Sequence, residues 1–172
     1  MAKNFEIERR FRIDTIGKLP KGLRPVFIRQ GYFNIIVDDG SSLRTRIYGT
    51  KRAELTGKLG RGIKRQEESG EISVDYAEFL LDNYCPHRAD KDRFRVGRWD
   101  VDFFRGILNG VIIAEIELES EYEGFVIPMW MAEYKEVTNT LTTHKLACLV
   151  SELKRKGLTK RSDVLEVVRR IS

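Results

Sequence analysis

An alternation of charged and apolar residues near the start of the chain is the feature that most restricts its fold. Glu6, Glu8 and Arg10 recur with a period of two. The residues between and after them are mostly apolar and include Phe5, Ile7, Phe11 and Ile13. Successive side chains of a β-strand point to opposite faces, so this period predicts a strand with one charged and one apolar face. Arg9 is the one charged residue on the apolar face.

The charged face of this strand has a chemistry that suits metal and phosphate. Carboxylates are hard oxygen ligands of the kind that Mg²⁺ and Mn²⁺ prefer, and a guanidinium on the same face suits phosphate oxygens. The strand could therefore hold a metal ion and a phosphate compound together. A single strand of this kind is more often part of an ordinary antiparallel sheet that has one solvated face.

Repetition of the pattern favours the first interpretation. Charged faces recur with Arg44 and Arg46 in residues 43–47, with Asp100 and Asp102 in residues 99–103, and with Glu115, Glu117 and two further glutamates in residues 111–121. If such strands close into a barrel, their charged faces line its bore. Charges enclosed in this way need partners of opposite sign, so we expect bound cations and anions inside the barrel.

The remaining patterns predict a strand-rich body followed by helices. Strand candidates are residues 3–13, 26–37, 42–49, 53–59, 62–74, 90–97, 98–105 and 111–122. Eight strands are enough to close a barrel. The pair Asn109-Gly110 is the sharpest hairpin signal and places two acidic strands side by side. Helices are predicted at residues 75–83, 144–155 and 163–171, the last with Ser162 as its N-cap.

Length and composition fit one compact domain that spans residues 1–172. The chain has a net charge of +5, but its 31 basic and 26 acidic residues are interleaved. This pattern favours small polyanionic ligands over extended contact with nucleic acid. Cys85 and Cys148 lack metal-ligand spacing, and no long apolar run is present. We therefore expect a soluble cytoplasmic protein without membrane contact.

No side-chain nucleophile or general base stands out. His87 follows a proline and His144 lies near a predicted helix start, so both are expected to be exposed and not catalytic. Residues 57–62 are rich in glycine but lack the lysine and following helix of a phosphate-binding loop. We therefore expect the chemistry to depend on metal ions.

The charged blocks, taken in order, resemble the CYTH superfamily, also called triphosphate tunnel metalloenzymes. The family's N-terminal Glu-x-Glu-x-Lys strand is similar to Glu6, Glu8 and Arg10, with arginine in place of lysine. The other blocks that resemble the family are residues 29–33, 44–46, 55–58, 65–67, 91–94, 99–103, 114–118 and 136–138. One departure is Ser69, where the family has a second glutamate. The resemblance covers most of the chain and implies an α+β fold: an antiparallel eight-stranded barrel, the triphosphate tunnel, covered by a few helices.

This resemblance implies hydrolysis of a triphosphate that depends on a divalent metal, Mg²⁺ or Mn²⁺. Inorganic tripolyphosphate or a nucleoside or other organic triphosphate is the expected substrate. The expected metal ligands are Glu6, Glu8, Asp102, Glu115 and Glu117. The expected phosphate-binding residues are Arg10, Arg44, Arg46, Lys58, Arg65, Lys91, Arg93 and Lys145. Catalysis is expected to involve Glu6, Glu8 and Arg10.

Two alternatives stay open at this point. In a class IV adenylate cyclase, the same bore would bind ATP and form cyclic AMP. A non-catalytic protein would bind a nucleotide or a triphosphorylated RNA end without turnover, and Arg10 and Ser69 keep this alternative open. Nucleic acid is otherwise not an expected partner, and the protein is expected to be a monomer or a homodimer.

Overall fold

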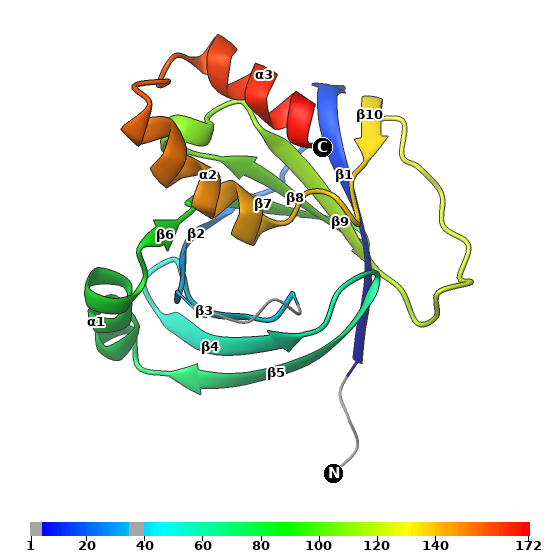
Figure 1. Cartoon of the computed structure of the whole chain (residues 1–172). Helices are drawn as coiled ribbons and strands as arrows, with labels where there is room; N and C mark the ends of the chain where they lie inside the picture. The colour runs from blue at the N-terminus through cyan, green and yellow to red at the C-terminus, as the bar shows by residue number, and fades with distance from the viewer. Residues whose placement is uncertain (1–4, 35–39) are drawn as a thin grey trace.

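The computed structural model describes residues 5–34 and 40–172. Within these residues the chain forms a closed β-barrel with three α-helices on its outside (Figure 1). The barrel strands are β1 (Phe5–Ile16), β2 (Val26–Tyr32), β3 (Ser42–Tyr48), β4 (Arg52–Leu59), β5 (Lys64–Ile72), β7 (Lys91–Val96), β8 (Trp99–Phe104) and β9 (Ile112–Glu117). These correspond to the eight predicted strands.

The barrel is antiparallel throughout and closes on its first strand. Its order is β1-β5-β4-β3-β2-β7-β8-β9, and β9 pairs again with β1. Two short strands, β6 (His87–Arg88) and β10 (Met131–Glu136), extend the sheet by pairing with β2 and β1. The predicted eight-stranded antiparallel barrel is thus confirmed.

Strand β1 is the seam of the barrel because it is long enough to serve three partners. Its first residues pair with β5, residues 8–12 pair with β9, and residues from Phe11 onward pair with β10. The register places Glu8 opposite Glu117 and Arg10 opposite Glu115. The alternation in the sequence therefore sends the charged side chains of β1 and β9 to the same side of the sheet.

The three helices lie where the sequence predicted them, at residues 75–83, 144–155 and 163–171. Helix α1 (Val74–Tyr84) begins after Ser73, whose hydroxyl accepts a hydrogen bond from the backbone N–H of Tyr76. Helix α2 (Thr143–Arg155) begins after Thr142, whose hydroxyl accepts from the N–H of Lys145. Both N-caps follow the usual pattern for these residue types.

The predicted cap of the last helix was wrong. Helix α3 (Arg161–Ile171) begins after Lys160, which makes no side-chain capping bond. Ser162 lies inside the first turn, and its hydroxyl donates to the carboxylate of Asp163. The helix itself was predicted correctly, and it buries Val164 and Val168.

Two apolar clusters fix helices α2 and α3 and the long loop to the barrel. The first joins α2 and α3 to the β8–β9 connection and includes Leu108, Leu146 and Val164. The second lies under the loop of residues 118–130, where Phe125 contacts Trp99 and Phe11 edge to face. Helices α2 and α3 thereby cover one side of the barrel, while the loop covers another (Figure 1).

The structure corrects several details of the strands. Strands β8 and β9 pair as the Asn109-Gly110 signal predicted, but a 3₁₀ helix, η1 (Gly106–Leu108), precedes the turn. Gly110 has a φ of 99° and the N–H of Val111 donates to the carbonyl of Leu108, as in a type II turn. Strand β10 was missed, and β9 ends at Glu117 instead of residue 122. The predicted strand residues 3–4 and 35–37 lie outside the described residues.

No helix in residues 5–34 and 40–172 has the length and apolarity needed to span a membrane.

The contact between β2 and α1 gives a test of the packing. A Cβ added to Gly31 would lie 2.5 Å from the Cβ of Cys85 and 2.8 Å from Cδ2 of Leu81. We expect Gly31→Ala to lower the free energy of unfolding by about 1 to 3 kcal/mol, because overpacking forces the neighbours apart. Gly70→Ala is the matched control, since its added Cβ meets nothing within 4 Å. Urea denaturation checks both variants, and equal stabilities would contradict the described packing.

Candidate active site

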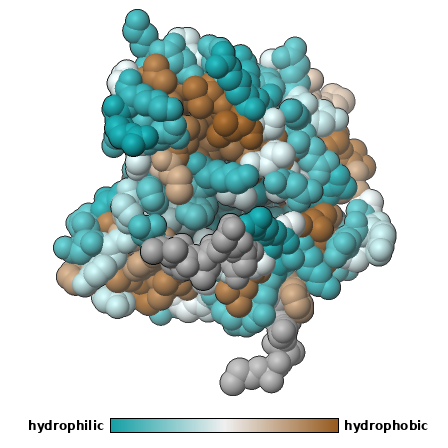
Figure 2. Space-filling view, in the orientation of Figure 1, coloured by the Kyte–Doolittle hydropathy of each residue, from teal (hydrophilic) through white to brown (hydrophobic). Residues whose placement is uncertain are grey.

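A cavity of about 470 Å³ occupies the bore of the barrel. Hydrophilic side chains surround the hollow on the face shown in Figure 2. Its acidic lining residues are Glu6, Glu8, Glu54, Glu67, Asp100, Glu115 and Glu117. Its basic lining residues are Arg10, Arg24, Arg44, Arg46, Arg52, Lys58, Arg65, Arg93, Arg95 and Arg98. Ten basic and seven acidic groups give the described lining a net charge of +3, and the volume suits a small molecule.

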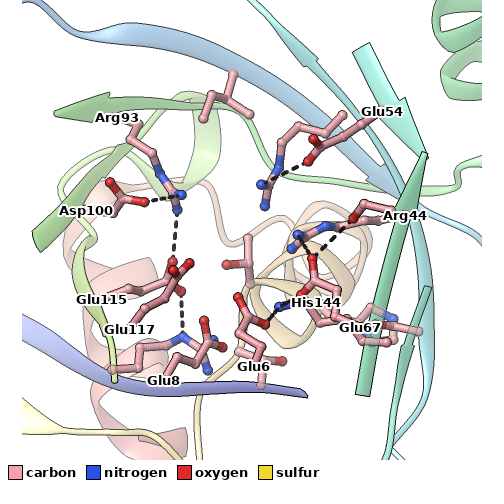
Figure 3. A pocket seen from close by; sticks show the side chains of 18 of the residues that line it. Glu6, Glu8, Arg44, Glu54, Glu67, Arg93, Asp100, Glu115, Glu117 and His144 are labelled. Atoms are coloured by element: carbon pink, nitrogen blue, oxygen red, sulfur yellow. Dashed lines mark hydrogen bonds and ion pairs between the residues drawn. The ribbon is translucent and has the colours of Figure 1, made fainter. Parts of the chain in front are cut away.

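One wall of the cavity is a chain of alternating charges across β1, β9 and β7. The Arg10 guanidinium donates to Glu8, and its Nε donates to Oε1 of Glu115 at 2.7 Å. The other oxygen of Glu115 accepts from Nη2 of Arg93 at 2.9 Å (Figure 3). Glu8 also accepts from Nη2 of Arg65 at 2.5 Å. Each buried charge on this wall thus has partners of opposite sign.

Burial and ion pairing compete in setting the pKa values of this wall. Burial opposes the charge of Arg10, but the carboxylates of Glu8 and Glu115 outweigh it and raise the pKa of Arg10. Burial likewise works to raise the pKa of Glu115, but Arg10 and Arg93 hold it well below its ordinary value. Nearby opposite charges therefore dominate over desolvation, and both groups are ionised.

The opposite wall places two carboxyl groups against one ammonium. Lys58 on β4 forms ion pairs with Glu6 and with Glu67, the latter at 2.5 Å. Arg44 lies 3.6 Å from Glu67. Burial and a hydrogen bond with Glu67 raise the pKa of Glu6, while that same hydrogen bond and Lys58 lower the pKa of Glu67 despite its burial. Of the two carboxyl groups, Glu6 is therefore the first to take up a proton as the pH falls.

Glu117 is the exception on these walls. It is the one acidic residue of the lining with no ion pair within the described part of the chain. Burial and the charges of Glu6 and Asp100 raise the pKa of Glu117. A carboxylate in this state gains from a cation placed beside it.

The aromatic rings of the lining already pack against other side chains. Tyr48 packs against Arg52, whose Cζ lies 4.2 Å from the ring centroid, and its hydroxyl donates to Glu54. Tyr32 stacks on His144 with 4.7 Å between ring centroids. These contacts compete with the stacking of a nucleobase on either ring.

Ten of the predicted site residues line this one cavity. They are Glu6, Glu8, Arg10, Arg44, Arg46, Lys58, Arg65, Arg93, Glu115 and Glu117. Three others lie outside the lining. The side chains of Lys91 and Asp102 are 0% exposed and pair with each other. Lys145 is exposed on α2, and its Nζ donates to the carbonyl of Thr140 at 2.8 Å.

Sequence reasoning missed several lining residues. Glu67 lies two positions from Arg65 on the same strand face, so the period of two could have identified it. Asp100 was placed on a charged strand face but not among the expected site residues. His144 was expected to be exposed, but it is partly buried and lines the cavity beside Tyr32. Its position depends on how α2 meets the barrel, which no local pattern reveals.

A barrel of this topology with charges of both signs in its bore is the α+β triphosphate tunnel fold. No protein-family model matches the chain. An inorganic triphosphatase of Acetivibrio thermocellus is 36% identical over 140 residues, which cover 77% of this chain and 85% of that relative. The chain therefore belongs to the same family as this enzyme, the CYTH superfamily.

Solved structures agree with this assignment. The crystal structure of an inorganic triphosphatase has a TM-score of 0.57 and 29% identity, covering 86% of this chain and 95% of that chain. A second crystal structure of that protein has a TM-score of 0.56 and 30% identity, covering 83% and 97% of the two chains.

Two glutamates on the same face of β9 should respond in opposite ways to neutral substitution. Glu117→Gln removes an unpaired carboxylate whose raised pKa means that ionisation destabilises the folded state, so we expect a higher unfolding midpoint at pH 7. The gain should vanish as the pH falls through that pKa, because wild-type Glu117 is then protonated. Glu115→Gln removes an ion-pair partner of Arg10 and Arg93, so it should lower the free energy of unfolding by roughly 3 kcal/mol. Thermal unfolding measures both, and destabilisation of similar size in the two variants would contradict the described pairing.

Proposed function

We propose that this protein hydrolyses inorganic tripolyphosphate with the help of Mg²⁺ or Mn²⁺ bound in the barrel. The observation that carries the proposal is the lining of the cavity, in which an excess of arginine and lysine is interleaved with carboxylates. Cations of the lining suit phosphate oxygens, and carboxylates suit a divalent ion. The inorganic triphosphatase among the relatives supports the same reaction.

The net charge of the cavity favours a complex of tripolyphosphate with a divalent metal ion. The described lining carries +3, whereas a tripolyphosphate with one divalent ion carries a net negative charge of similar size. A phosphate chain without a metal ion would take basic residues from their ion pairs and leave the carboxylates beside it without partners. The metal ion removes that repulsion, so the complex of metal and phosphate matches the cavity better than either part alone.

The carboxylates of the lining are suitable ligands for a divalent ion, but most of them must first give up their ion pairs with arginine and lysine. Within residues 5–34 and 40–172, no group of three or more potential ligands converges on a metal position as the side chains lie. Most of the carboxylates point at arginine or lysine instead. If phosphate draws these cations away, Glu6, Glu8 and Glu115 would join the unpaired Glu117 in holding the metal. The bound ion would supply Lewis-acid charge and a site that orients water.

The basic residues have the complementary role. Arg10, Arg44, Arg46, Lys58, Arg65 and Arg93 lie in the lining and would bind the phosphate groups. Guanidinium groups form paired hydrogen bonds with phosphate oxygens and stabilise the charge that develops during phosphoryl transfer. Phosphoryl transfer needs positioning and electrostatic stabilisation more than a protein nucleophile. The lack of a nucleophile constellation in the sequence is compatible with this chemistry.

An inorganic chain suits the cavity better than a nucleotide. A nucleobase is commonly held by stacking on an aromatic face. Tyr32 and Tyr48 in the lining are already engaged by His144 and Arg52. A nucleotide would have to displace one of these contacts, and an inorganic chain would not.

Identification of products tests the proposal. The purified protein is incubated with tripolyphosphate, ATP or a 5′-triphosphorylated RNA, with Mg²⁺, Mn²⁺ or chelator, and the products are separated by chromatography. We expect orthophosphate and pyrophosphate from tripolyphosphate, at a higher kcat/KM than for ATP, and no release with chelator. Cyclic AMP and pyrophosphate from ATP would instead indicate a cyclase. Tight binding of any of the three without turnover would indicate a binding protein.

Two substitutions test the metal ligands. We expect Glu8→Gln and Glu117→Gln to lower kcat/KM for tripolyphosphate at least about a hundredfold, because each removes a negatively charged oxygen ligand. Glu121→Gln is the control, since Glu121 is exposed and lies outside the lining. Circular dichroism at the assay temperature verifies that each variant is folded. Rates like the wild type in both lining variants would overturn the metal assignment.

A further inference from the structure

Three charged side chains form a buried triad at the wall of the cavity. Lys91 and Arg93 lie on β7, and Asp102 lies on the paired strand β8. The side chains of Lys91 and Asp102 are 0% exposed, with 2.5 Å between Nζ and Oδ2, and neither lines the cavity. The side chain of Arg93 is 17% exposed and does line it. The triad thus meets the cavity through Arg93.

Asp102 holds Arg93 by two parallel hydrogen bonds. Nε of Arg93 donates to Oδ1 at 2.6 Å, and Nη2 donates to Oδ2 at 2.6 Å. This bidentate geometry fixes the plane of a guanidinium as well as its position. Asp102 therefore sets the direction in which the rest of the Arg93 guanidinium faces.

The other carboxylates on Arg93 differ from Asp102 in one respect. Nη1 donates to Asp100 at 2.7 Å, and Nη2 donates to Glu115 at 2.9 Å. Asp100 and Glu115 line the cavity, so an entering metal ion or phosphate can compete for these contacts. Asp102 is shielded from the cavity. Its contact with Arg93 is the one that persists when the others exchange partners.

Electrostatics keep Asp102 ionised in this shielded position. Burial works to raise the pKa of Asp102, but the charges of Lys91 and Arg93 outweigh burial and lower it. The carboxylate therefore accepts hydrogen bonds from both cations and donates none. Lys91 pairs with Asp102 on the side away from the cavity, where burial and the charge of Arg93 lower the pKa of Lys91 to about 7.

We infer that Asp102 is a positioning residue that orients Arg93 toward a phosphate group, and that Lys91 is its buried counter-ion. Neither residue contacts metal or substrate. The sequence had placed Asp102 among the metal ligands and Lys91 among the phosphate-binding residues. The inference deepens the proposed function and rests on it for the identity of the phosphate ligand.

The first test separates phosphate binding from metal binding. We expect Asp102→Asn to weaken the binding of tripolyphosphate about tenfold to a hundredfold. Calorimetry with chelator present measures this affinity. Mn²⁺ affinity without phosphate, measured by electron paramagnetic resonance, should stay within about twofold of the wild type, since no ligand is lost. A loss of Mn²⁺ affinity as large as that of Glu117→Gln would overturn the inference and restore Asp102 as a metal ligand.

The same strand offers a matched control. Asp92 on β7 holds Arg105 by two hydrogen bonds of 2.7 Å, outside the cavity lining. Asp92→Asn breaks the same kind of pair, so it should leave tripolyphosphate affinity unchanged. Equal losses in Asp92→Asn and Asp102→Asn would show that any broken pair on β7 weakens binding through the fold, and would contradict a positioning role.

A double-mutant cycle tests whether Asp102 acts through Arg93. In an Arg93→Gln background, Asp102→Asn should cost little further tripolyphosphate affinity, because its target is gone. Additive losses would overturn the inference. The tripolyphosphate affinity of Lys91→Met should stay within about threefold of the wild type, since Asp102 still holds Arg93. A loss as large as that of Asp102→Asn would mean that Lys91 binds phosphate itself.

A readout without any ligand keeps the inference distinct from the proposed function. The side-chain Nε–H of Arg93, assigned in NMR spectra with Arg93→Gln, should exchange slowly in the wild type and rapidly in Asp102→Asn. If wild-type protein neither binds nor hydrolyses tripolyphosphate, the proposed function fails while this signal still tests the anchoring of Arg93. If Asp102→Asn does not fold, Asp102→Glu, which keeps the charge but shifts the carboxylate, replaces it in each measurement. No change in exchange would overturn the anchoring.

Discussion

Mutual neutralisation of charges inside a closed barrel is the constraint on which this structure depends. The bore contains seven carboxylates and ten basic groups among the described residues, and most of them are shielded from solvent. An isolated charge in such a place is strongly destabilising. The protein meets this cost by alternating signs along its walls, as in the run Arg65, Glu8, Arg10, Glu115 and Arg93. The walls of the cavity therefore form a network of ion pairs.

Arg10 links this network to the parts of the fold outside the barrel. Its guanidinium donates to the carbonyl of Leu141 at 3.3 Å, just before α2, and its backbone N–H donates to the hydroxyl of Thr138. The resemblance to the family would place a lysine here, but an ammonium lacks the planar fork that lets arginine contact several acceptors at fixed angles. Arginine at this position therefore serves the wall of the cavity and the approach to α2 together. The same ion pairs must loosen for the carboxylates to bind a metal, so stability and the proposed activity compete for the same side chains.

The sequence predicted the barrel well because the barrel is built from local alternation. In β1, β3 and β9, the period of two determines which side chains enter the bore, and no long-range information is needed to find Glu8, Arg44 or Glu117. The local pattern does not predict how deep along the bore a side chain lies, because this depth depends on strand register and on what covers each end of the barrel. Asp102 follows the same alternation as Asp100, yet only Asp100 lines the cavity. His144 enters the cavity through the packing of α2, and β10 forms because β1 extends past the barrel. Both depend on tertiary contacts that the local pattern does not encode.

We expect metal and phosphate to help each other to bind, because each releases lining groups for the other. This coupling can be measured as the affinity for Mn²⁺ with and without a non-hydrolysable imido analogue of tripolyphosphate, after correction for the complex that the two form in solution. We expect the analogue to tighten Mn²⁺ binding by about tenfold or more, within the usual range of coupling between two sites. Mn²⁺ affinity that is unchanged by the analogue, or weakened by it, would contradict the exchange of partners on which the proposed activity rests.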